Sequence, residues 1–196
     1  MGNRFRLPPT LLLGMLLAIA CSGGTAPSPR PSAAGTPVLS PRAAVAIRPP
    51  SSDILAENEV GLVLAGGTDH VTVTQAAAEQ PNQPLALTLY RSWGWTDEAV
   101  RAWGDSRQRA DDALLLLTKS DGAQRAFGDF AAQFVKSPFA VIDCPAGLAV
   151  DQCREGKSGS LAVIVVRVDR YVFRMQGLNV DLEQLATLQA AKIAEP

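Results

Sequence analysis

The sequence predicts an α+β domain with a mainly antiparallel sheet packed against two or three helices, and with one structural disulfide. Residues 160–167 and 171–175 are rich in β-branched and aromatic residues and are separated by a short turn, which is typical of a hairpin. Helical patterns stand between the strand patterns and after them, without the regular alternation of a parallel α/β fold. Cys144 and Cys153 are close enough in sequence to form the disulfide.

The first part of the domain is predicted to hold two short helices with two strands between them. Residues 54–60 follow the capping pair Ser52-Asp53, and Gly66-Gly67 ends this helix or its continuation. Residues 71–74 and 85–90 alternate in polarity or size, as strands with one buried face do. Thr96 is suited to cap the next helix, whose first turn carries Asp97 and Glu98 as the helix dipole prefers.

The second part begins with residues 113–118, a short apolar run that is predicted to be a buried strand. Ser120 or Asp121 opens the strongest helical pattern, which Pro138 closes. Further strands are predicted over residues 139–142, 160–167 and 171–175. Asp181 with Gln184 resembles a capping box and predicts a last helix from Leu182 towards Ile193.

Composition and charge exclude some classes of function. Hydrophobic residues make up 47% of the chain, as in a globular protein. From Asp53 onward 13 Lys and Arg stand against 19 Asp and Glu, which gives this part a net charge of −6. Since nucleic-acid binding needs a concentrated basic face, no nucleic-acid partner is expected.

The N-terminus has the organisation of an export signal. Arg4 and Arg6 precede an apolar run over residues 11–20, which is shorter than the roughly 20 residues of a transmembrane helix. The string Leu17-Ala18-Ile19-Ala20-Cys21 resembles the lipobox of bacterial lipoproteins, although the third residue before the cysteine is usually Leu in that family. The resemblance implies cleavage before Cys21 and lipid on its sulfur. Ala18-Ile19-Ala20 also suits the general signal peptidase, so free secretion is the alternative.

Residues 21–52 are expected to form a tether. Seven of the fourteen prolines fall here, at positions 27, 29, 31, 37, 41, 49 and 50. A segment rich in Pro, Ser and Ala lacks the apolar content for a core and keeps a solvated backbone. The expected organisation is a signal peptide over 1–20, a lipidated cysteine and tether over 21–52, and a globular domain over 53–196. The lipid on Cys21 would hold the domain on the extracytoplasmic side of the cell membrane.

Few residues have the chemistry of a catalytic or metal site. Outside the cytoplasm Cys144 and Cys153 are expected to be oxidised to a disulfide, and the C-x-x-C spacing of redox motifs is absent. His70 next to Asp69 is interpreted as a loop histidine, with a general base as the alternative. The chain has 1 His, so no metal site is expected, and no motif indicates a cofactor.

The aromatic residues around position 93 are the strongest candidates for a binding site. Trp93 and Trp95 lie on either side of Gly94, Tyr90 precedes them, and Trp103 follows. On a strand the indoles of Trp93 and Trp95 would point to one face and could form a platform for a ligand. Packing in the core is the alternative, because indoles bury a large area.

The layout of elements resembles small lipid-anchored extracytoplasmic proteins of high-GC bacteria. The resemblance rests on residues 52–60, on the helix that contains Gly122-Ala123 and Phe127, and on the hairpin from Val163 to Tyr171 with its closing helix. Many such proteins have no assigned activity, and some resemble ligand-sensing ectodomains. The resemblance implies a non-enzymatic domain that binds or senses an unknown small ligand. The alternatives are a structural adaptor that binds an envelope protein and an extracytoplasmic hydrolase.

Overall fold

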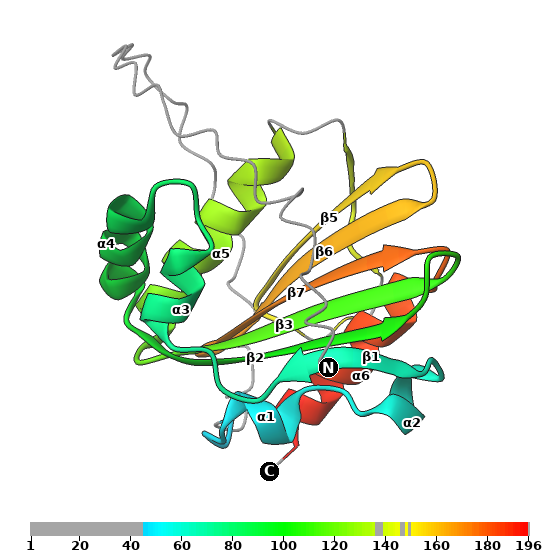
Figure 1. Ribbon diagram of the computed structural model, residues 1–196, viewed down its shortest axis with the longest axis horizontal. Coiled ribbons are helices and arrows are strands. Elements are labelled where there is room, and N and C mark those ends of the chain that lie inside the picture. The colour runs from blue at the N-terminus through cyan, green and yellow to red at the C-terminus, as the bar shows by residue number, and fades with distance from the viewer. Residues whose placement is uncertain (1–44, 136–138, 146–147, 149, 196) are drawn as a thin grey trace, which may run out of the picture. The chain divides into compact units, whose positions relative to one another are not determined.

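Seven strands form a single sheet in the computed structural model, which describes residues 45–135, 139–145, 148 and 150–195 (Figure 1). The strands are β1 (Leu64–Thr68), β2 (Trp95–Gly104), β3 (Arg109–Leu117), β4 (Ala140–Ile142), β5 (Gln152–Ser158), β6 (Leu161–Val168) and β7 (Tyr171–Leu178). Their spatial order is β1-β2-β3-β7-β6-β5-β4, and every neighbouring pair is antiparallel. The predicted α+β class with an antiparallel sheet is therefore confirmed.

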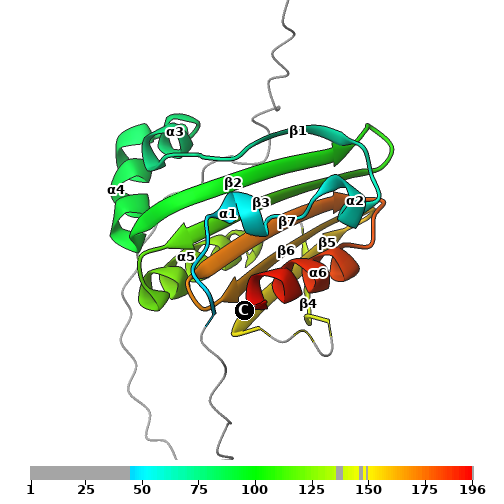
Figure 2. The same ribbon diagram turned by 90° about the horizontal axis from the view of Figure 1, so that it is seen from below.

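Helices cover both faces of the sheet (Figures 1 and 2). They are α1 (Pro50–Asp53), α2 (Glu57–Val60), α3 (Val73–Ala78), α4 (Gln83–Trp93), α5 (Ser120–Val135) and α6 (Leu182–Ala194). One apolar cluster joins α3, α4 and α5 to the sheet, and a second joins the α1 region and α6 to the opposite face. No helix in the described part of the chain is both long and apolar enough to span a bilayer.

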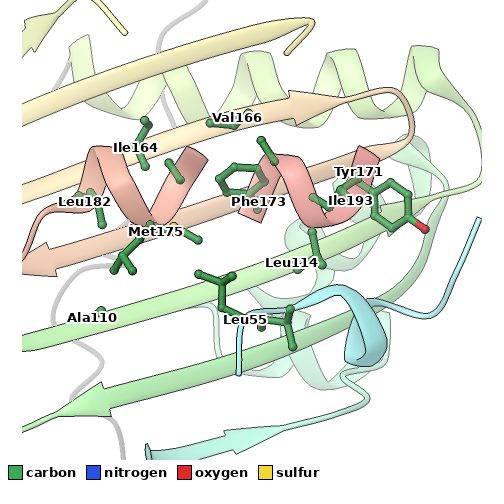
Figure 3. Packing of buried hydrophobic residues seen from close by; sticks show 14 of the residues in the cluster. Leu55, Ala110, Leu114, Ile164, Val166, Tyr171, Phe173, Met175, Leu182 and Ile193 are labelled. Carbon is green, nitrogen blue, oxygen red and sulfur yellow. The ribbon is translucent and has the colours of Figure 1, made fainter. Parts of the chain in front are cut away.

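The two apolar clusters explain the unbroken apolar runs in the sequence. In β3, Leu114 and Leu116 face the α6 side whereas Leu115 and Leu117 face the α5 side. Residues 163–166 of β6 divide between the two clusters in the same way. Figure 3 shows Ile164, Val166 and Phe173 around α6, with Leu55 on the other side of Leu114. A strand that is buried on both faces needs apolar residues at every position.

Several predicted elements are confirmed with local causes. The strand over 113–118, the helix that starts at Ser120 and the strand over 139–142 correspond to β3, α5 and β4. Asp169 makes the tight turn between β6 and β7 with a φ of 52°. The side chain of Asp181 accepts a hydrogen bond from the Gln184 backbone N–H at 3.0 Å and caps α6. Pro138 lies outside the described residues.

The strands predicted over 71–74 and 85–90 are wrong, because these segments belong to helices. The Thr72 side chain accepts a hydrogen bond from the Gln75 N–H and caps α3. The Asn82 side chain accepts one from the Leu85 N–H and caps α4. The alternating leucines at 85, 87 and 89 remain partly or largely exposed. The buried residues of α4 are Ala86, Tyr90 and Trp93, which follow helical spacing.

The predicted helix after Thr96 is also wrong, since Thr96 lies in β2. Gly94 ends α4 in the left-handed conformation, with a φ of 79°. From Trp95 onward the chain pairs with β3 along the whole strand. The helix predicted over 54–60 is confirmed only over Glu57–Val60, which form α2, because Ile54 and Leu55 enter the core after the separate helix α1. Gly66-Gly67 lies in β1, and the polar strand β5 was not predicted.

The last residues assigned to the tether pack against the domain. The backbone N–H of Arg48 donates to the hydroxyl of Tyr171 at 2.7 Å, and that hydroxyl donates to the Arg48 carbonyl at 2.8 Å. Arg48 also forms an ion pair with the buried Asp53 at 2.8 Å. Residues 45–52 are therefore part of the folded unit. Cys21, the predicted signal peptide and the rest of the predicted tether lie outside the described residues.

Candidate functional site

Tyr90, Trp93 and Trp95 meet in one aromatic cluster, which α4 and β2 form together. The ring centroid of Tyr90 lies 4.9 Å from that of Trp93 and 5.0 Å from that of Trp95. Trp93 also contacts Phe130 of α5 edge-on, with centroids 5.4 Å apart. The sequence therefore identified neighbours correctly, but the two indoles come from a helix and a strand rather than from one strand.

The environment of the two indoles indicates packing. Trp93 is 3% exposed, and its indole N–H donates to Asp129 Oδ2 at 2.9 Å. Trp95 is half-buried, and its N–H donates to the Val71 carbonyl at 3.3 Å. Both polar groups thus have partners within the protein. Only Trp95 keeps a partly exposed ring, so the cluster offers little of the platform that the sequence suggested.

Glu98 is a titratable group beside this cluster. Its burial raises the pKa of the carboxyl to about 7, although Arg174 favours the ionised form and lowers the pKa. Burial and the nearby Glu98 together raise the pKa of Tyr90. The guanidinium of Arg174 lies 5.8 Å from the centroid of the Phe130 ring, where it makes a cation–π contact. The α5 side of the sheet therefore combines aromatic rings with Arg174 and with the carboxyl group of Glu98, whose pKa is about 7.

Cys144, Cys153 and His70 lie outside the aromatic cluster and were the other candidates for chemistry in the sequence. Cys144 and Cys153 form the predicted disulfide, with Cα atoms 6.1 Å apart, and it connects β5 to the chain that follows β4. His70 Nδ1 lies 2.9 Å from Asp97 Oδ2, and 67% of the His70 side chain is exposed. Asp97 is its only hydrogen-bond partner within the described residues. Those residues also contain no group of three or more His, Cys, Asp and Glu side chains placed to hold a metal.

A different site lies between α1 and β2, where a depression of about 300 Å³ opens next to the start of β1. We call it the α1–β2 pocket. Its lining residues are Ser51, Ser52, Ile54, Leu55, Ala56, Glu57, Leu64, Arg101, Trp103 and Lys192. The pocket therefore combines an indole and aliphatic side chains with two cations, one carboxylate and two hydroxyls.

Trp103 lines this pocket and has a buried indole N–H group without a hydrogen-bond acceptor among the described residues. It is 1% exposed, and its indole N–H has no hydrogen-bond partner within the described residues. Burying such a group without a partner costs about 1–3 kcal/mol. The N–H is itself closed to solvent, so a ligand could reach it only if the lining of the pocket moved. Trp103 thus differs from Trp93 and Trp95, whose N–H groups are satisfied internally.

Arg101 and Asp112 extend the polar site towards the core. They lie opposite each other on β2 and β3, so their side chains share one face of the sheet. Arg101 instead pairs with Asp69, whose side chain is 60% exposed. To reach it, Arg101 passes over Gly67, where a Cβ would stand 2.8 Å from Arg101 Cδ. The Arg101 side chain is 18% exposed, and its Nη1 also donates to the Val100 carbonyl at 3.0 Å.

Asp112 is buried, and neither carboxylate oxygen makes a hydrogen bond of normal geometry within the described residues. This burial raises the pKa of Asp112 to about 8, against smaller opposing effects of the Ala113 backbone and Arg101. Sequence reasoning missed Arg101, Trp103 and Asp112 as a site. The only available signal was the spacing of Ala99, Arg101 and Trp103, which lie two residues apart and would share one face of a strand. It was not recognised because this segment was predicted to be a helix.

The fold and these residues define a two-faced antiparallel α+β domain with a small polar-and-aromatic pocket. No family model matches the sequence, and no curated protein matches it. Among solved structures, the chain is similar to the extracellular domain of PknH from Mycobacterium tuberculosis. The two share 13% sequence identity with a TM-score of 0.46, over 74% of this chain and 92% of that one.

Proposed function

We propose that this protein is a lipid-anchored extracytoplasmic lipoprotein whose folded domain binds or senses a small ligand without catalysis. The observation that carries the anchor is the apolar run over residues 11–20, which ends directly at Cys21. The Cys144–Cys153 disulfide supports an oxidising compartment, because cytoplasmic thiols are kept reduced. Two or more acyl chains at Cys21 would give stable anchoring, whereas one would not.

Replacement of Cys21 tests the anchor. In cells that express the full chain, the wild-type protein should incorporate labelled palmitate and enter the detergent phase of a Triton X-114 partition. Cys21→Ser should remove both properties. The double variant Cys144→Ser/Cys153→Ser is the matched control, since it removes two cysteines and should stay in the detergent phase. A wild-type protein found in the aqueous phase contradicts the anchor, and two free thiols in the exported protein contradict the oxidising compartment.

The ligand is proposed to occupy the α1–β2 pocket. The buried and unpartnered N–H of Trp103 supports this choice, because it would gain an acceptor if the pocket opened to admit a ligand. Arg101 and Lys192 are paired with Asp69 and Glu59 and could exchange these partners for an acidic group of the ligand, and Leu55 with the indole adds apolar surface. Such a mixture of apolar surface with few polar groups is typical of small-molecule sites.

Native mass spectrometry tests the pocket with protein purified gently from its own membrane. The protein should retain a small-molecule adduct, and Trp103→Phe should lose it, because phenylalanine keeps a ring but has no N–H group. Trp95→Phe is the matched control and should retain the adduct. The absence of any adduct, or its equal loss in both variants, counts against the pocket.

A hydrolase is a weaker proposal. The pair of His70 and Asp97 is the nearest approach to a catalytic group, and it lies on the surface with no hydroxyl among its described hydrogen bonds. A nucleophile within hydrogen-bond reach of the base is what such catalysis requires. We therefore place hydrolysis below binding among the proposed functions.

One observation favours the second function, that of a structural adaptor. All five residues of the edge strand β1 are exposed, and Val63 next to it is 74% exposed. An open strand edge can pair with an extended segment of another protein. If the protein is an adaptor, a cross-linkable group at Val63 should capture an envelope protein in cells, and Val63→Lys should prevent this.

A further inference from the structure

Three chain connections meet at one end of the sheet, on the left in Figure 1. They are the α4–β2 junction at Gly94, the β3–α5 junction at Thr118 and the β6–β7 turn at Arg170. The Thr118 N–H donates to the Gly94 carbonyl at 2.8 Å, and the Leu117 N–H donates to the Arg170 carbonyl at 3.0 Å. These backbone hydrogen bonds hold the three connections together.

Four basic residues surround these connections, and we call them the basic end. They are Arg91, Lys119, Arg125 and Arg170. The first three are exposed and line a depression of about 410 Å³ at the start of α5, and Arg170 is half-buried beside it. Two acidic residues, Asp121 and Asp169, lie within or next to the group. The basic end therefore keeps an excess of positive charge.

The cations of the basic end have no carboxylate partner within the described residues. Arg125 donates to the Ser92 carbonyl and Arg170 to the Thr118 carbonyl, each at 2.9 Å. Other cations of the same unit do have acidic partners. They are Arg48, Arg101, Arg109, Lys157, Arg167 and Lys192. These four cations lie on a domain that is acidic as a whole, since residues 53–196 hold 13 Lys and Arg against 19 Asp and Glu, a net charge of −6.

The first described residues of the chain contact the same end of the strands, but on the α6 face of the sheet, opposite to α4 and α5. Arg48 is hydrogen-bonded to the hydroxyl of Tyr171, the residue directly after Arg170. In the sheet, Tyr171 pairs with Leu116, close to Thr118.

We propose that the basic end is a docking surface for the anionic lipid headgroups of the membrane that carries the anchor. This inference rests on the proposed lipid anchor, which would keep the surface at high local concentration near the bilayer. Charge complementarity supports it, because each basic side chain near an anionic membrane raises the binding constant by about fivefold. An acidic protein partner is the competing occupant.

Vesicle co-sedimentation tests the proposal with the mature chain that carries Cys21→Ser, so that lipid cannot contribute. This protein should bind vesicles of phosphatidylglycerol and phosphatidylcholine, should bind far less to phosphatidylcholine alone, and should dissociate as salt is raised. Lys119→Glu should lower the partition coefficient by at least about fivefold. Arg107→Glu is the matched control, because Arg107 is an exposed cation between β2 and β3, at the opposite end of both strands.

The outcomes separate the proposal from its alternatives and from the anchor itself. Equal losses in Lys119→Glu and Arg107→Glu would mean a general charge effect and overturn it. Binding to polyglutamate but not to anionic vesicles would overturn it in favour of an acidic protein partner. If the Cys21→Ser chain does not bind anionic vesicles but the wild-type chain enters the detergent phase, the lipid anchor is supported and only the docking surface is contradicted. If the Cys21→Ser chain binds anionic vesicles but the wild-type chain is not lipidated, the lipid-binding surface is supported and the lipid anchor is contradicted.

Discussion

Asp112 is a carboxyl group placed among apolar side chains. It lies between Ala110 and Leu114 on the α6 side of β3, and both of these neighbours belong to the core cluster on that face. Since burial raises its pKa to about 8, Asp112 carries a proton at neutral pH in the folded protein. The unfolded chain would ionise the same group near its ordinary pKa of 3.8.

This difference predicts a loss of stability with rising pH. Between pH 3.8 and about 8 the folded state binds more protons at Asp112 than the unfolded state does. The free energy of unfolding should therefore decrease by up to about 1.4 kcal/mol per pH unit and level off above this window. Asp112→Asn should remove this part of the slope. Urea unfolding over a pH series measures it, and identical slopes for the two proteins would contradict the buried-acid assignment.

The indoles at positions 93 and 95 should differ in their contribution to stability. Trp93→Ala should lower the free energy of unfolding by about 3–5 kcal/mol, because it empties a buried site and leaves Asp129 without its donor. Trp95→Ala should cost clearly less, since that ring is half-buried. Denaturant unfolding compares the two variants. A similar loss for both would show that Trp95 is as much a core residue as Trp93.

At the scale of one element, α5 contains two glycines in contrasting surroundings. A Cβ at Gly122 would lie 1.8 Å from the Trp93 carbonyl oxygen, so this glycine lets α5 approach the end of α4. At Gly128 a Cβ would meet no atom within 4 Å. The sequence pattern does not distinguish these two positions, since both lie inside the same predicted helix.

The two glycines predict opposite effects of the same substitution. Gly122→Ala should destabilise the protein by about 1–3 kcal/mol or more, because backbone must move to make room. Gly128→Ala should stabilise it by about 0.5–1 kcal/mol, because alanine is the better helix former. Thermal unfolding of both variants provides the measurement. Stabilisation by Gly122→Ala would mean that α4 and α5 are not in contact there.

At the scale of the whole molecule, the C-terminal helix holds the N-terminal segment. Gln189 of α6 is fully buried, and its Oε1 accepts a hydrogen bond from the Leu55 N–H at 3.0 Å. Its Nε2 donates to the Asp53 carbonyl at 2.7 Å. The Gln189 amide thus provides hydrogen-bond partners for the Leu55 N–H and the Asp53 carbonyl, which lie in the core outside any strand.

Gln189→Leu is predicted to leave both backbone groups without a partner. The expected loss is about 2–4 kcal/mol in the free energy of unfolding, with faster hydrogen exchange at Leu55. Gln184→Leu in the same helix is the control and should change stability by less than about 0.5 kcal/mol, because its side chain is exposed. Unchanged exchange at Leu55 in Gln189→Leu would contradict this role.

Local signals in the sequence were sufficient for the fold class, the β6–β7 hairpin, α5, α6 and the disulfide. These elements depend on neighbours in sequence: a turn at Asp169, a cap at Asp181, and a helical apolar stripe in α5. Short-range hydrogen bonds and periodicity act within one segment, so they can be recognised without knowing the rest of the fold.

Long-range packing decided the remainder. Residues 85–90 fit both a strand and a helix. Helical spacing places Tyr90 against Trp95 of β2 and Trp93 against Phe130 of α5. The polar strand β5 exists because β6 and β4 supply its hydrogen bonds. The α1–β2 pocket and the basic end arise from residues that are distant in sequence, such as Arg101 opposite Asp112 and Arg170 beside Thr118. Burial and local charge depend on which segments become neighbours in space, and that is set only when the sheet is assembled.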